Sequence, residues 1–111
     1  MENKDLGKTS LGMQANVAAL LCYLLWFITG IIFYILEKEN KFVRFHAMQS
    51  IVTFGFFFVL SIILGFMPFI NFLIIFVWII EMILWVILMV KAYQGEHFKL
   101  PVAGDIAEQN S

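Results

Sequence analysis

The chain has 111 residues, of which 62% are hydrophobic and 14% are charged, and its formal net charge is −1. Soluble domains contain about 45–50% apolar and about 25% charged residues, so this composition predicts a membrane protein. The near-neutral charge gives no basic surface for nucleic acid, and the single cysteine, Cys22, excludes an intrachain disulfide framework. We therefore expect one membrane domain and no nucleic-acid partner.

The N-terminal third contains a polar tail and a long apolar run. Residues 1–14 are polar and mixed in charge, which predicts a tail. Residues 15–36 contain no charged residue, and as one helix they would be about 33 Å long, close to a hydrocarbon core of about 30 Å. We expect this run to be the first transmembrane helix. Asn16, Tyr23 and Gly30 recur every seven positions on one of its faces, which should contact other helices.

Residues 37–50 form a densely polar segment between two long apolar runs. The second helix should begin inside it, because polar side chains recur there at i, i+3, i+4 and i+7 from His46 to Thr53. This stripe either binds an anionic headgroup or senses pH, or it is simply a polar helix start at the interface. His46 and His97 lack a third fixed ligand, so we expect no metal site. The interfacial polar stripe comprises Arg44, His46, Gln49 and Ser50.

The next charge-free run extends from Phe45 to Ile80 and would be about 54 Å long as one helix, too long for one span. Gly65, Pro68 and Asn71 are its helix breakers, so the chain should turn there. The predicted fold is an all-α integral membrane protein whose three transmembrane helices, at about 15–36, 42–67 and 70–93, form a small antiparallel bundle with a C-terminal tail at 94–111.

The basic residues predict an orientation. Three spans would place Lys4 and Lys8 on one side of the membrane and the remaining five Lys and Arg residues on the other. Loops rich in Lys and Arg stay on the inner side. The polar segment and the C-terminal tail should therefore be cytoplasmic, and the N-terminus should be outside.

Glu81 lies near the middle of the third predicted span. An ionisable group there costs at least about 2.5–3.5 kcal/mol on insertion scales and is usually retained for a role. One interpretation is a protonated carboxyl that forms a hydrogen bond with another helix, and Tyr23 and Thr53 are its expected partners by depth. The other interpretation is a functional carboxylate. The sequence leaves both open.

Several segments resemble a known family. The chain is similar to a widespread family of small, uncharacterised prokaryotic membrane proteins, which is itself similar to the twenty-kilodalton inner-envelope component of the chloroplast protein-import translocon. The resemblance implies a location in a prokaryotic plasma membrane and a possible tie to protein translocation. This chain differs from the chloroplast protein in the number of spans, because four helices are described for that protein and three are expected here. The resemblance covers roughly residues 11–107 and rests on Asn16 to Leu20, Glu37 to Ser50, Lys91 to Gly95, Pro101 and Gly104.

Enzyme motifs are missing from the sequence. It has no Ser/His/Asp set, no HExxH motif, no Gly-rich phosphate loop and no pair of carboxylates in one span, so we expect neither an enzyme nor a cofactor. The function we expect is a non-enzymatic structural or assembly component that contacts membrane lipids and forms a homo-oligomer or binds partner membrane proteins. The alternative is a transport or protein-translocation subunit that uses Glu81.

Overall fold

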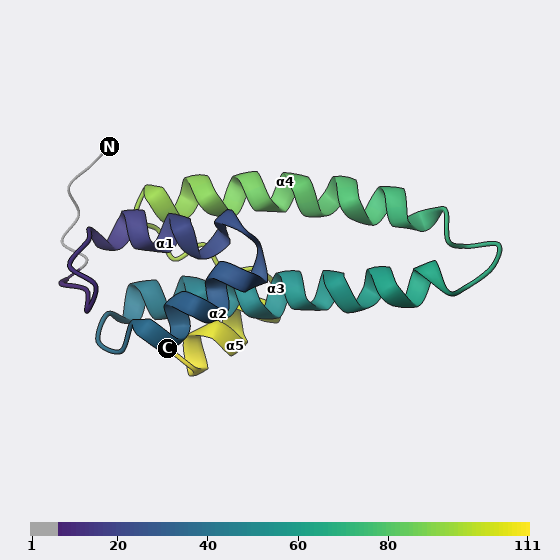
Figure 1. Cartoon of the computed structure of the whole chain (residues 1–111). Coiled ribbons are helices and arrows are strands. Elements are labelled where there is room, and N and C mark those ends of the chain that lie inside the picture. The colour runs from purple at the N-terminus through teal and green to yellow at the C-terminus, as the bar shows by residue number, and fades with distance from the viewer. Residues whose placement is uncertain (1–6) are drawn as a thin grey trace.

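The computed structural model describes residues 7–111, and the predicted all-α class is confirmed for them. Residues 1–6 of the predicted N-terminal tail lie outside the described part of the chain. The ribbon in Figure 1 follows the chain from one end of an elongated molecule to the other and back. Its helices are α1 (Ala15–Leu24), α2 (Phe27–Leu36), α3 (Lys41–Gly65), α4 (Leu73–Tyr93) and α5 (Ala103–Gln109).

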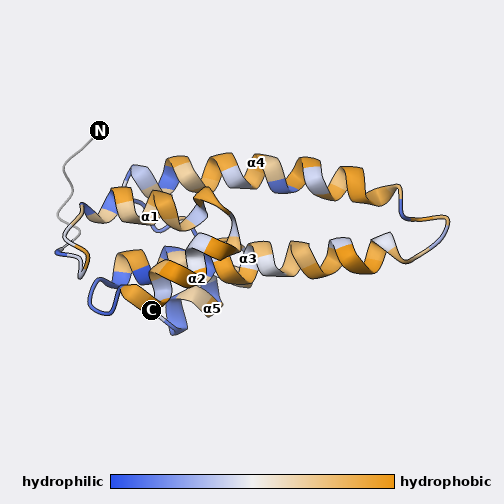
Figure 2. Ribbon diagram, in the orientation of Figure 1, coloured by the Kyte–Doolittle hydropathy of each residue, from blue (hydrophilic) through white to orange (hydrophobic). Residues whose placement is uncertain are grey.

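Helices α3 and α4 form a long antiparallel pair. With 25 and 21 residues they are the two described helices that are long and apolar enough to cross a membrane. Their bounds agree with the second and third predicted spans, and the predicted turn coincides with the loop at residues 66–72. Figure 2 shows apolar residues along most of both helices and hydrophilic residues concentrated at the end opposite this loop. The loop itself carries no charged residue and exposes Phe66 and Phe69.

The expectation of three spanning helices is not confirmed. The predicted first span, residues 15–36, is interrupted at Leu25 and Trp26, and Trp26 has the left-handed dihedral φ 57°. Helix α2 then runs back beside α1 (Figure 1). The two ends of this run meet, because the backbone nitrogen of Ser10 lies 2.8 Å from a carboxylate oxygen of Glu37. The run is therefore a hairpin that enters and leaves at the same end of the molecule.

Polar side chains stabilise the break between α1 and α2. The hydroxyl of Thr29 accepts a hydrogen bond from the Leu25 nitrogen and donates one to the Cys22 carbonyl, each at 3.1 Å. The hydroxyl of Ser50 on α3 donates to the Trp26 carbonyl at 2.7 Å. These bonds replace the helical bonds that the turn removes, as a non-helical backbone away from water requires.

The molecule has a broad part and a narrow part, with extents of 50 × 26 × 21 Å. We call the broad part the base. It comprises α1, α2, α5 and the neighbouring halves of α3 and α4, and it contains most of the buried side chains, such as Tyr23, Phe45 and Leu88. The narrow part is the stalk, residues 55–84. In the stalk Leu64 is the one buried side chain.

Gly30 allows α2 to approach α3 closely. A Cβ atom at this position would lie 2.9 Å from the Ala47 carbonyl oxygen and from the Ser50 side chain. We predict that Gly30→Ala lowers the free energy of unfolding by about 1–3 kcal/mol, the usual cost of overpacking. Gly55→Ala is the matched control, because nothing lies within 4 Å of its added Cβ atom. Thermal unfolding in mild detergent checks this, and equal stability of the two variants would contradict the close contact.

Candidate functional site

Tyr23, His46 and Gln49, which we call the inner polar cluster, lie fully buried in the base. The nitrogen Nε2 of His46 lies 2.8 Å from the Glu96 carbonyl oxygen, which can only accept, so Nε2 carries a hydrogen atom. The other ring nitrogen, Nδ1, lies 2.7 Å from the Tyr23 hydroxyl. A neutral imidazole accepts at Nδ1, so in that form the hydroxyl of Tyr23 donates to it.

Gln49 links this cluster to the C-terminal segment. Its Nε2 group donates to the Tyr23 hydroxyl at 3.0 Å and to the Phe98 carbonyl at 2.8 Å. Its Oε1 atom accepts from the Leu100 nitrogen at 2.9 Å. All three side chains of the cluster are therefore satisfied by partners within the chain, and they leave no polar atom free for a substrate.

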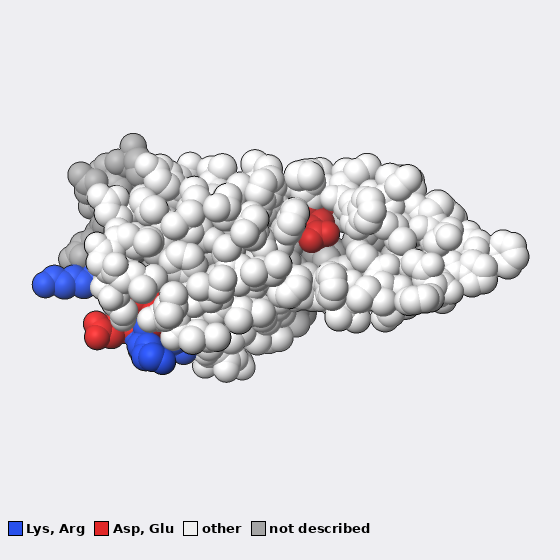
Figure 3. All heavy atoms as spheres, viewed as in Figure 1, with Lys and Arg blue, Asp and Glu red and all other residues white. Residues whose placement is uncertain are grey.

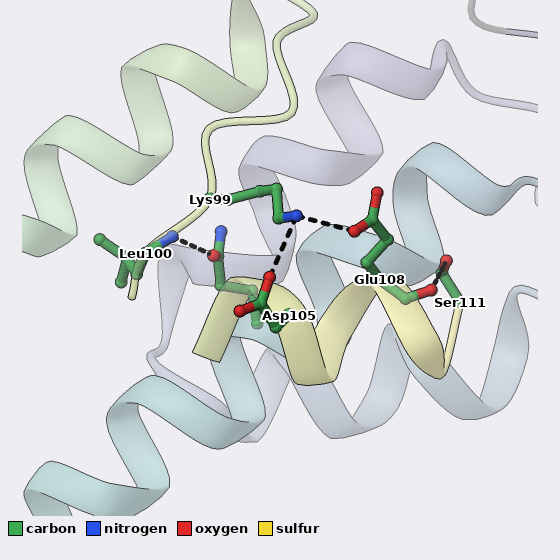
Figure 4. A network of polar contacts seen from close by, with 6 residues as sticks. Lys99, Leu100, Asp105, Glu108 and Ser111 are labelled. Carbon is green, nitrogen blue, oxygen red and sulfur yellow. Dashed lines mark hydrogen bonds and ion pairs between the residues drawn. The ribbon is translucent and has the colours of Figure 1, made fainter. Parts of the chain in front are cut away.

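Figure 4 shows how the C-terminal segment folds over the base. The amino group of Lys99 lies 3.1 Å from the Asp105 carboxylate and 2.7 Å from the Glu108 carboxylate. These ion pairs hold α5 against the segment that precedes it, and Gln49 binds that segment through the Leu100 nitrogen. Residues 94–111 are thus packed on α3, although the sequence indicated only a tail.

Arg44 and Glu37 organise the polar segment at the end of the base. The Arg44 guanidinium donates to the carbonyls of Tyr34 at 3.1 Å and Glu37 at 2.8 Å, and it lies 4.1 Å from the centre of the Tyr34 ring. The Asn40 side chain accepts from the Val43 nitrogen at 3.0 Å and so caps α3. Arg44 is therefore occupied by protein carbonyls close to the molecular surface.

The Glu37 carboxylate is fully buried and accepts five hydrogen bonds. Three come from Ser10, and the backbone nitrogens of Glu39 and Asn40 supply the others. Burial alone would raise the pKa of this carboxyl, but the donors from Ser10, Asn40 and Glu39 outweigh it, and the pKa lies below its usual value. Glu37 therefore fixes residues 8–10 to the loop before α3. This role could not be predicted from the sequence, because Ser10 lies 27 positions before Glu37 along the chain.

Glu81 lies apart from these networks. It lines a cavity of about 320 Å³ between α3 and α4, just beyond the hairpin residue Trp26. Figure 3 shows acidic atoms in a hollow midway along the molecule, far from the other charged atoms of this face, which lie at one end; Glu81 is the only charged residue that the sequence places between Arg44 and Lys91. Its carboxyl has no hydrogen bond to another described residue. Ser61 supplies the one hydroxyl group in the cavity lining.

The structure does not bring Tyr23 or Thr53 to Glu81, contrary to the expectation from their depth. The Tyr23 hydroxyl bonds His46 and Gln49. Thr53 lines a different groove, of about 660 Å³, with apolar residues of α4 and of the C-terminal segment. Its hydroxyl is the one buried side-chain polar atom without a partner among the described residues. The expected pairing assumed a straight first span, and the hairpin places Tyr23 in the base instead.

The two histidines lie close together without forming a metal site. The rings of His46 and His97 are 6.2 Å apart and nearly parallel, but both nitrogens of His46 already have partners. Burial lowers the pKa of His97, although the Glu108 charge acts in the opposite direction. Within residues 7–111 no group of three or more His, Cys, Asp or Glu side chains is placed to share a metal ion.

Comparison with known proteins identifies the family. Residues 8–107 match the model of the magnetosome magnetite crystal formation protein family. The chain belongs to this family. It is 60% identical to a UPF0132 membrane protein of Methanocaldococcus jannaschii over 96% of both chains, and 55% identical to a UPF0132 membrane protein of Archaeoglobus fulgidus over 87% of this chain and 95% of the relative. A second Methanocaldococcus jannaschii member is 46% identical over 90% of this chain and 72% of its own length.

No solved structure gives a significant match. The family membership confirms the expected kind of protein, a member of a family of small, uncharacterised prokaryotic membrane proteins. The resemblance to the chloroplast import component is not tested by these relatives and stays a prediction.

Removing the Tyr23 hydroxyl should destabilise the base. Tyr23→Phe leaves Nδ1 of His46 and one Gln49 hydrogen atom without partners, which costs about 1–3 kcal/mol when such groups are buried. Tyr93→Phe is the control, because Tyr93 is exposed at the end of α4. Unfolding of both variants in detergent measures the difference. An unchanged stability of Tyr23→Phe would show that the cluster does not support the fold.

Glu37 predicts a dependence of stability on pH. Its folded-state pKa lies below the usual value of 4.5, so its contribution is present above that pH and is lost as the pH falls through the folded-state pKa. We expect Glu37→Gln to be less stable at pH 7 by about 1.5–3 kcal/mol, the range for hydrogen bonds to charged groups. The difference should shrink in acid. Unfolding from pH 7 to pH 3 tests this beside Glu39→Gln, whose side chain is exposed; a gap that does not change with pH refutes it.

Proposed function

We propose that this protein is a non-enzymatic structural or assembly component of a prokaryotic membrane. The closed inner polar cluster supports this role best. Tyr23, His46 and Gln49 are buried side chains that can donate or accept hydrogen bonds. Their hydrogen bonds join the hairpin, α3 and the C-terminal segment. Groups that carry out a reaction need an open position for a substrate, and these have none.

The family description concerns magnetite crystal formation. The proposal for this chain uses the membrane location of the relatives and does not extend to crystal formation. The relatives are described as membrane proteins, and two helices of this chain have the length and composition to span. The proposed role therefore rests on the membrane-embedded base and stalk.

The stalk supports an assembly role. From Leu73 to Ile87 no side chain of α4 is buried within the chain. Helices in lipid associate through packing and hydrogen bonds, and a narrow pair of helices leaves both outer faces free for such contacts. We infer that copies of the chain associate along the stalk to form a homo-oligomer, or that the stalk binds partner membrane proteins.

The charge distribution supports an orientation. The described basic residues all belong to the base end, whereas the loop at residues 66–72 has none. The rule that basic loops stay inside therefore favours an orientation in which the end of the base faces the cytoplasm. Because Ser10 contacts Glu37 and the Tyr34 hydroxyl contacts Asn110, the described chain ends share that side, and we do not retain the expected outside N-terminus.

A second candidate function is a transport or protein-translocation subunit. One observation favours it: the Glu81 carboxyl lies in a cavity where the stalk meets the base, and it has no hydrogen-bond partner among the described residues. Ionisable residues inside a membrane often mark an ion path.

Single cysteines test the orientation in a Cys22→Ala background. We expect Leu11→Cys and Gln109→Cys to be protected from an impermeant maleimide in intact cells, and Asn71→Cys in the loop of the stalk to be labelled. Labelling after membrane permeabilisation is the control. If Leu11→Cys is labelled while Gln109→Cys is protected, residues 15–36 cross the membrane and the hairpin is wrong.

Two differently tagged copies test the assembly role. We expect them to co-purify from membranes in mild detergent when they are co-expressed, and not when the separately expressed proteins are mixed after solubilisation. Liposomes containing wild type or Glu81→Gln should show equally low ion flux. A monomer that conducts ions only with the Glu81 carboxyl would reject the structural role and favour the transport subunit.

A further inference from the structure

The cavity at Glu81 combines a carboxyl group with aromatic rings. Trp26, Trp78 and Glu81 line both this cavity of about 320 Å³ and an adjoining one of about 310 Å³. The two cavities therefore share one carboxyl group and two indole rings in their walls. The rest of the lining is apolar except for one hydroxyl, and it comprises Phe27, Phe54, Phe58, Ser61, Ile62 and Met82.

Within residues 7–111, no positively charged side chain lines the cavities at this carboxyl. No Lys or Arg occurs between Arg44 and Lys91, and the cavity lining contains no basic residue. An ionised carboxylate at this depth needs a counter-charge from outside the chain. Indole rings add to the attraction, because tryptophan is the side chain whose face attracts cations most strongly.

The lining also limits the kind of cation. A metal ion such as Ca²⁺ or Mg²⁺ requires about six oxygen ligands, and only Glu81 and Ser61 offer side-chain oxygen atoms here. A small, strongly hydrated cation would lose its water without replacement. A bulky organic cation with delocalised or shielded charge is poorly hydrated and gains contact with the aromatic walls. The cavity volume also falls within the range of small-molecule sites.

We propose that Glu81, Trp26 and Trp78 form a binding site for a lipophilic organic cation. This site goes beyond the structural role of the base and does not require that the bound cation cross the membrane. The cation reaches it from the lipid, since the exposed fraction of the Trp78 side chain is 58% and the cavity opens between the stalk helices.

Equilibrium dialysis of tetraphenylphosphonium with the full chain in mild detergent tests the site. We expect Glu81→Gln to weaken binding at least about tenfold, since it removes the charge and keeps the shape, and Glu81→Asp to retain most of the affinity. Trp78→Leu should weaken binding roughly two- to thirtyfold, the range for a cation–π contact. Glu108→Gln, at an exposed carboxylate of α5, is the matched control and should bind as wild type does.

Neutral triphenylphosphine oxide distinguishes recognition of the positive charge from hydrophobic contact with the cavity walls. It should bind wild type no better than tetraphenylphosphonium binds Glu81→Gln. Equal binding of the cation and the neutral compound overturns the proposal, as does equal cation binding by wild type and Glu81→Gln. Loss of the oligomer in Glu81→Gln with cation binding retained also overturns it, because the cavity would then be an interface between copies. Circular dichroism confirms that each variant is folded before binding is compared.

Discussion

Backbone groups that leave a helix inside the base must find partners within the chain, and one face of α3 provides them. Ser50 bonds the hairpin turn, His46 bonds the loop after α4, and Gln49 bonds the segment before α5. Irregular backbone at membrane depth is tolerated only where protein surrounds it. The hairpin and the C-terminal segment therefore both depend on polar side chains that fall on one stripe of a single long helix.

This dependence divides the molecule into two chemically different parts. In the base, polar groups are numerous and, apart from the Thr53 hydroxyl, have hydrogen-bond partners, so they specify one arrangement of the segments around α3. In the stalk, polar groups are few, and Glu81 has no hydrogen-bond partner among the described residues. Interactions with other molecules are therefore open to the stalk, whereas the polar residues of the base are already committed to the fold.

Part of this division could be predicted from the sequence. The charge-free run from Phe45 to Ile80, with Pro68 about two-thirds of the way along it, has few solutions other than two helices and a turn, because both covalent geometry and membrane thickness restrict it. The hairpin could not be predicted in the same way. Residues 15–36 have the length of a span, and the break contains neither Gly nor Pro. Its partner Ser50 lies on another helix, so the information is long-range.

The polar candidates show the same limit. The spacing of His46, Gln49 and Ser50 correctly placed them on one face, since that follows from helix geometry alone. Their partners are mostly backbone carbonyl groups and one tyrosine, which no spacing reveals.

The uncharged loop between α3 and α4 has a consequence for biogenesis. In the arrangement proposed above, with α3 and α4 as the spans, insertion carries the seven uncharged loop residues across the bilayer, and Glu81 is the only Asp, Glu, Lys or Arg between Arg44 and Lys91. In that arrangement the hairpin enters and leaves on the side of the base, so the turn between α1 and α2 does not have to cross the membrane.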